Sequence, residues 1–156
     1  MKKLLLIFAL VALTIGASAQ SFFTPVTADQ LRAEGDKALT GTFLIRPEFT
    51  IAGNVIKPVF IDGKFSSFDV SFASRVGMGA SYSLYKLVDG EPYNVYSFAA
   101  QLSLATIERP NMGILLTASA FELYGLSPSV GFGYDFIKDS PFRANYFFMW
   151  GLNKTF

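Results

Sequence analysis

The feature that most constrains this chain is a two-residue alternation of apolar side chains with small or polar ones. It recurs in residues 76–84, 96–104, 130–136 and 146–156. Successive side chains of a β-strand point to opposite faces of the sheet, so this period predicts strands with one apolar face. We therefore expect an all-β fold. Its kind depends on which solvent meets the apolar face.

Clusters of glycine, proline, asparagine and aspartate separate the expected strands. Turns are predicted at Gly53-Asn54, Asp62-Gly63, Asp89-Gly90, 109–111, Tyr124-Gly125 and 138–141. Residues 65–87 fit either one long strand or two strands that meet near Arg75. The expected number is therefore about eight strands, or six if 65–87 is not a hairpin and 55–61 does not pair.

The second face of these strands indicates which solvent the apolar face meets. A soluble sheet usually presents charged and polar side chains to water on its outer side. Here that face is mostly glycine, serine and alanine, for example Gly77, Gly79, Ser97, Gly131 and Gly133. Such residues suit the crowded interior of a narrow closed barrel. The strands are also long, at roughly 12 residues against about 5–6 in soluble sheets, so we expect a small closed antiparallel transmembrane β-barrel.

The positions of the charged residues agree with this arrangement. Three charged residues occupy positions expected to face outward: Lys86, Glu122 and Lys154. All three lie near strand ends, at the end of the barrel where the last strand finishes. A charge on the lipid face costs about 2–4 kcal/mol at mid-membrane but roughly 0–1 kcal/mol near the interface. Five charged residues occupy positions that are expected to face the barrel interior. We expect them to form a network in the lumen: Arg46, Glu48, Asp69, Arg75 and Asp135.

The expected lumen also contains small and large side chains that complement each other. Six glycines occupy positions that are expected to face the lumen: Gly77, Gly79, Gly113, Gly131, Gly133 and Gly151. Larger inward side chains are expected to fill the space that these glycines leave: Tyr85, Phe121, Phe147 and Met149. In segment 22–37, Thr27 is expected to cap a short helix that Gly35 ends, and this segment is positioned to cover the periplasmic mouth. The interior is therefore predicted to be occluded.

The first residues have the pattern of a secretory signal. Two lysines precede an apolar run over residues 4–15, and Ala17-Ser18-Ala19 supplies small residues for cleavage before Gln20. The apolar run is too short for a comfortable helical span. We expect export through the Sec pathway and three regions: a signal peptide at 1–19, an N-terminal periplasmic segment at 20–40 and the β-barrel at 41–156.

In these features the chain resembles the small outer-membrane β-barrel proteins of Gram-negative bacteria. The resemblance rests on the signal ending, the alternating strands and the terminal Phe156, and it is architectural. It implies two partners, outer-membrane lipid and the barrel-assembly machinery, which in that family recognises an aromatic residue at the end of an amphipathic last strand. The implied assembly signal is Phe148, Trp150, Leu152 and Phe156, although Lys154 stands where an apolar residue is commoner.

The composition limits the chemistry that the chain can perform. It contains no histidine and no cysteine, which excludes Ser-His-Asp and Cys-His sites, thiolate metal sites and disulfides. The glycine pairs at 77–79 and 131–133 lie within strands and precede no helix, unlike phosphate-binding loops. The 13 basic and 12 acidic residues show no basic excess of the kind that nucleic-acid binding needs. We expect no enzymatic activity, no metal and no cofactor.

These inferences favour a non-enzymatic structural component or scaffold of the outer membrane. The first alternative is a narrow passive pore for ions or small solutes. The second is a secreted soluble β-sandwich that acts as a binding or assembly subunit of a virion or an appendage. The predicted outer loops at 108–111 and 138–141 are short. This argues against elaborate ligand recognition, which usually needs long outer loops.

Overall fold

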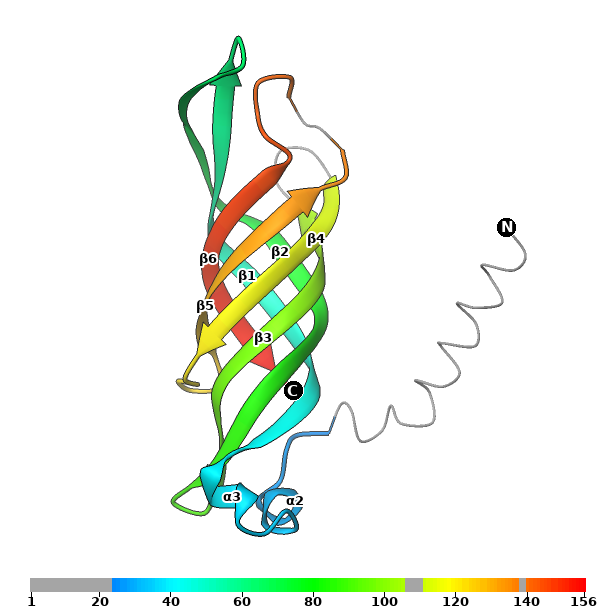
Figure 1. Cartoon of the computed structure of the whole chain (residues 1–156), viewed down its shortest axis with the longest axis vertical. Coiled ribbons are helices and arrows are strands. Elements are labelled where there is room, and N and C mark those ends of the chain that lie inside the picture. The colour runs from blue at the N-terminus through cyan, green and yellow to red at the C-terminus, as the bar shows by residue number, and fades with distance from the viewer. Residues whose placement is uncertain (1–23, 106–110, 138–139) are drawn as a thin grey trace, which may run out of the picture.

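The computed structural model describes residues 24–105, 111–137 and 140–156 (Figure 1). Two short helices precede six strands, and their bounds are α2 (Ala28–Arg32), α3 (Lys37–Thr40), β1 (Thr42–Ile61), β2 (Lys64–Val88), β3 (Glu91–Ala105), β4 (Asn111–Ala120), β5 (Ser127–Asp135) and β6 (Tyr146–Thr155). The predicted signal peptide and its cleavage site before Gln20 lie outside the described residues. Within the described ranges, neither helix is long and apolar enough to span a membrane.

The six strands form one antiparallel sheet that closes on itself. Each strand pairs with the next along the chain, and β1 also pairs with β6, which completes a closed barrel (Figure 1). The prediction of an all-β antiparallel fold is confirmed. A β-sandwich, one of the alternatives from the sequence, requires two sheets packed face to face. The described strands instead belong to a single sheet.

The described sheet has six strands rather than eight. The predicted turn at Gly53-Asn54 is wrong, because β1 continues through it with a shift of register. Ala52 pairs with Gly151, and Asn54 pairs with the adjacent residue Trp150, so Gly53 is an extra residue in β1. One extra residue of this kind bends a strand without reversing it. Residues 55–61 therefore lengthen β1 and pair with β2, which is itself a single long strand.

Three other predicted turns are confirmed as tight reversals. Both residues have positive φ in each of them: 51° and 74° at Asp62-Gly63, 52° and 83° at Asp89-Gly90, and 52° and 78° at Tyr124-Gly125. Two-residue turns of this conformation match the twist of the strands they join, and Asp-Gly is a preferred sequence for them. These turns set the register of three of the hairpins.

Side-chain burial follows the predicted alternation. In β2, Gly77, Ser81 and Ser83 are buried, whereas Met78 and Tyr82 are exposed. Odd residues face the lumen in segment 75–85 of β2, in β4, β5 and β6 and in most of β3. In β1 the inward parity changes from even to odd at the Gly53 bulge.

One hairpin extends beyond the closed sheet. Strand β6 pairs with β1 only as far as Ile56, and the described pairing of β3 with β2 begins at Arg75. Residues 57–72, here called the projecting hairpin, therefore rise above the barrel at the top of Figure 1. Phe60 N donates to the Phe142 carbonyl oxygen at 2.7 Å, so segment 141–146 lies along the β1 side of this hairpin. Helices α2 and α3 lie at the opposite end, which we call the helix end.

Candidate functional site

The polar part of the lumen is organised around Glu48 of β1. Glu48 faces inward on the even side of the strand, and only 1% of its surface is exposed. Its carboxylate oxygens accept hydrogen bonds from side chains of β3, β4 and β6: Ser97 Oγ (2.6 Å), Gln101 Nε2 (3.1 Å), Thr117 Oγ1 (3.1 Å), Asn153 Nδ2 and Thr155 Oγ1 (3.3 Å). All five of these donors are neutral. They hold the buried carboxyl group by hydrogen bonds from across the barrel.

A second buried group joins Arg75 of β2 to Asp135 of β5. Arg75 Nη1 lies 2.7 Å from Asp135 Oδ1, and Arg75 Nη2 donates to Oδ2 at 3.0 Å. Lys57 Nζ lies 2.8 Å from the same Oδ2. Arg75 is 2% exposed and Asp135 is fully buried. Removal of one partner from such a pair leaves an uncompensated buried charge, which is strongly destabilising.

The other two members of the predicted network have different surroundings. Arg46 Nε donates to the Phe156 carbonyl oxygen at 2.6 Å, and Arg46 Nη2 donates to the Thr24 carbonyl oxygen. Asp69 lies on the projecting hairpin, 2.9 Å from Arg143 Nε, with about a third of its side chain exposed. The structure thus brings Arg75 and Asp135 together and places Glu48, Arg46 and Asp69 elsewhere. Shared parity defines a face of the sheet but not a height along the barrel.

An apolar layer separates the Glu48 group from the Arg75–Asp135 group. Along β1 the inward side chains follow the order Glu48, Thr50, Ala52, Val55 and Lys57. Two of them belong to the layer, which consists of Ala52, Val55, Leu115, Phe147 and Met149. Every member is buried, and the layer lies between the two polar groups along β1.

The predicted fit between glycines and large side chains occurs within this layer. A Cβ atom on Gly133 would lie 2.1 Å from Cζ of Phe147, so the aromatic ring occupies the space that the glycine leaves. Arg75 Cζ lies 4.1 Å from the centroid of the same ring, which links the apolar layer to the charged group. The prediction that Phe121 faces inward is wrong. Strand β4 ends at Ala120, and Phe121 is 48% exposed with a φ of 30°.

Helix α2 packs against the inward side of β2 at the helix end. Thr27 and Gln30 form a capping box at its N-terminus, in agreement with the predicted start of a helix at Thr27. Leu31 of this helix is 1% exposed and packs with Tyr85 of β2. Three partly buried side chains complete this contact: Val26, Leu44 and Leu87. Two apolar clusters, the α2 cap and the layer around Leu115, thus lie along the barrel interior.

The outer surface of the closed sheet is apolar on all six strands. Its exposed side chains include Phe43, Ile45, Ile51, Met78, Tyr82, Phe98, Leu102, Leu104, Met112, Ile114, Leu116, Val130, Phe132, Tyr134, Phe148, Trp150 and Leu152. Aromatic rings gather near both ends: Phe43 stacks on Tyr82 at 4.6 Å, and Phe132 contacts Tyr146 at 6.3 Å. The outward charges Lys154 and Glu122 lie 3.9 Å apart at the helix end.

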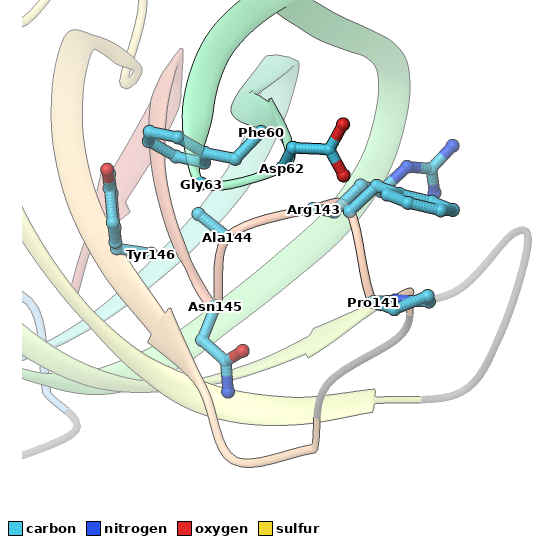
Figure 2. A pocket seen from close by; sticks show the side chains of 9 residues that line it. Phe60, Asp62, Gly63, Pro141, Arg143, Ala144, Asn145 and Tyr146 are labelled. Atoms are coloured by element: carbon cyan, nitrogen blue, oxygen red, sulfur yellow. The ribbon is translucent and has the colours of Figure 1, made fainter.

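An open pocket of about 490 Å³ lies between the projecting hairpin and segment 141–146 (Figure 2). Its lining includes Phe60, Asp62, Arg143 and Asn145. Arg143 is paired with Asp69, and Asn145 Nδ2 donates to the Asp135 carbonyl oxygen at 3.1 Å. These polar groups therefore hold segment 141–146 against the barrel.

Sequence reasoning missed two charges that matter in these groups. Lys57 faces inward because the Gly53 bulge changes the parity of β1, which no local pattern around Lys57 reveals. Arg143 lies outside the regular strands, where no periodicity indicates its direction. The acidic side chains of the described residues do not form a cluster of three or more that could hold a metal ion.

Comparison with known proteins gives no relative for this chain. No protein-family model matches it, and no curated protein or solved structure is significantly similar to it. The inference of function therefore rests on the closed sheet, its buried polar groups and its apolar exterior.

Proposed function

We propose that this protein is an integral outer-membrane β-barrel with a closed interior, serving as a non-enzymatic structural component or scaffold of the envelope. The apolar exterior of the closed sheet carries the proposal. Soluble monomers rarely expose apolar patches larger than a few hundred Å². Here exposed apolar side chains come from every described strand, while polar side chains such as Glu48 and Asn153 are buried inside. Lipid favours such an arrangement, because a closed sheet leaves no unpaired edge in the hydrocarbon.

The dimensions of the sheet support the same proposal. Strands β4, β5 and β6 contain 10, 9 and 10 residues. Tilted strands of about 9–11 residues are long enough to cross the hydrocarbon core. The aromatic rings near both ends fit the interfacial girdles of membrane barrels, and the Lys154–Glu122 pair lies where charges are tolerated. We place the helix end in the periplasm.

The last strand is compatible with recognition by the barrel-assembly machinery. Phe148, Trp150 and Leu152 point outward and are 46–52% exposed, and Phe156 is 45% exposed. Lys154, which weakens the sequence match to such a signal, is paired with Glu122. The proposed assembly signal is thus accessible along one face of β6.

Membrane fractionation tests the proposed location directly. The mature protein should sediment with the outer membrane, resist carbonate extraction and migrate differently on gels before and after boiling. Recovery of most of the protein as a soluble periplasmic or secreted species would contradict the proposal.

A pair of arginine substitutions tests whether the exterior meets lipid. Leu116 lies near the middle of β4 and Met112 near its start, and both are exposed. In vesicles, Leu116→Arg should lower the free energy of unfolding by about 2–4 kcal/mol, and Met112→Arg by roughly 0–1 kcal/mol, because the cost of a charge depends on its depth. Denaturant titration of the two variants measures this difference. Small, equal effects are the result expected if water surrounds both positions.

We infer that the α2 cap and the layer around Leu115 block the lumen, so the protein should not conduct ions steadily. The intact mature protein should give at most small, erratic conductance in planar bilayers. Deletion of residues 22–37 removes the α2 cap but leaves the layer around Leu115 and Phe147. That deletion should therefore not open a channel unless Leu115→Ala and Phe147→Ala are added. Steady, ion-selective channels from the intact protein would favour the passive pore instead.

A further inference from the structure

The proposed function does not account for one large apolar surface, the outward face of the projecting hairpin. Four side chains of β2 on this face are 55–73% exposed: Phe65, Phe68, Val70 and Phe72. They pair across the hairpin with Phe60, Pro58, Ile56 and Asn54. The rings of Phe65 and Phe68 lie 5.0 Å apart, so they form a continuous aromatic surface.

The polar side chains of the hairpin lie on its other face. Lys57 reaches Asp135 in the barrel, and Asp69 pairs with Arg143 of segment 141–146. Ser67, which pairs with Val59, has the same parity as Asp69. The projecting hairpin is therefore amphipathic in the same sense as the barrel, with polar groups inward and apolar groups outward.

The apolar face of the hairpin and the outward face of the barrel lie on the same side of β2. Even residues of β2 point outward at Phe68, Val70 and Phe72 on the hairpin and at Met78 and Tyr82 on the barrel. No charged residue occupies an outward position between Phe65 and Leu84. The first outward charge beyond this range is Lys86 near the helix end, and Asp62 and Lys64 flank the tip of the hairpin.

The apolar exterior is consequently taller on one side of the barrel than on the other. At about 3.3 Å per residue and a tilt of about 45°, the uncharged face of β2 from Phe65 to Tyr82 rises about 42 Å. The same estimate gives only about 23 Å for the 10 residues of β4. A membrane that matches β4–β6 thus leaves the hairpin face above the hydrocarbon if the barrel stands upright.

We propose that the outward face of the projecting hairpin contacts the acyl chains of the surrounding lipid, and that the barrel tilts to bring this face into the membrane. The inference rests on the proposed membrane location. A hydrophobic length that exceeds the bilayer thickness is commonly accommodated by tilting. A protein partner normally meets a polar rim around an apolar centre. This face has no such rim along its length, because the hairpin's polar groups lie on the opposite face.

Single-cysteine labelling tests this contact, since the chain contains no cysteine of its own. The full mature protein carrying Phe68→Cys or Phe72→Cys would be labelled with a fluorophore and placed in phosphatidylcholine vesicles that contain nitroxide-labelled acyl chains. Leu116→Cys serves as the reference on the barrel exterior, and Ser67→Cys as the control on the opposite face. Quenching at 68 and 72 should come within about twofold of that at 116 and exceed that at 67 by about threefold or more.

The outcomes separate this inference from the proposed function. A label at 116 that lipid nitroxides do not quench contradicts the membrane location itself. Quenching at 116, with labels at 68 and 72 quenched only by aqueous iodide, overturns the hairpin contact and leaves the barrel proposal intact. Labels at 68 and 72 shielded from both quenchers indicate a protein on this face, such as a second copy, and also overturn lipid contact. Heat-modifiable migration of each variant verifies that it has folded.

Discussion

Replacement of Glu48 by alanine is expected to lower the free energy of unfolding by about 3–5 kcal/mol. The reason is the number of groups that lose their acceptor at once: five side-chain donors from three strands meet this one carboxylate. Each buried donor left without a partner costs about 1–3 kcal/mol, but Ser97 keeps Ser119 as a partner and Thr117 keeps Asn153, so the total stays below five such costs. Denaturant titration in micelles measures the loss, with the fluorescence of Trp150, the single tryptophan, as the signal.

Two further variants identify the source of the Glu48 effect. Glu48→Gln keeps one carbonyl acceptor and should recover part of the lost stability. Glu122→Ala removes a partly exposed carboxylate that lies 3.9 Å from Lys154. Such surface pairs contribute about 1 kcal/mol or less, so this control should stay close to the unmodified protein. Losses of equal size for Glu48→Ala and Glu122→Ala would show that the cluster around Glu48 is not a major source of stability.

Gly151→Val is expected to destabilise the barrel at the seam where β1 meets β6. A Cβ atom on Gly151 would lie 2.2 Å from the backbone oxygen of Ile51 and 2.9 Å from Cα of Ala52. Backbone atoms in a paired strand cannot move aside unless the pairing opens. The loss should therefore reach or exceed about 3 kcal/mol, the upper end for overpacked interiors, although valine favours strands more than glycine does. The readouts are denaturant titration and the fraction of heat-modifiable protein.

Ala100→Val is the matched control for the seam. Ala100 lies on the exposed outer face of β3, so its added methyl groups enter no packed interior. Its effect should stay within about 0.5 kcal/mol, as for most surface substitutions. A comparable loss in both variants would assign the cost to the β-branched side chain rather than to the crowded lumen.

The sequence predicts the faces of this sheet better than its connections. The period of two places Gly77 inside and Met78 outside without knowledge of any neighbour, because alternation is a property of a single strand. The Asp-Gly turns are equally local. Gly53-Asn54 has the composition of a turn, yet it forms a bulge. Whether such a pair forms a turn or a bulge depends on which strand the following residues pair with. For Gly53-Asn54 that partner is β6, about a hundred residues further along the chain.

The same distinction explains the partial prediction of the lumen groups. Parity identifies Glu48, Arg75 and Asp135 as inward, and all three are buried. It gives no height along the barrel, so it cannot separate Asp69 on the projecting hairpin from Asp135 in the closed sheet. Height depends on the stagger between neighbouring strands, which the hydrogen-bond register of the whole ring determines.

The donors around Glu48 also bear on how the chain assembles. They lie 49, 53, 69, 105 and 107 residues further along the chain, and the last two belong to β6. Contacts across such long separations form late, because the intervening chain must first be ordered. Until β6 arrives, the carboxylate lacks two of its partners and the seam beside it stays open. Docking of the last strand and completion of this hydrogen-bond shell are therefore one event, which makes closure cooperative and a half-closed sheet unfavourable.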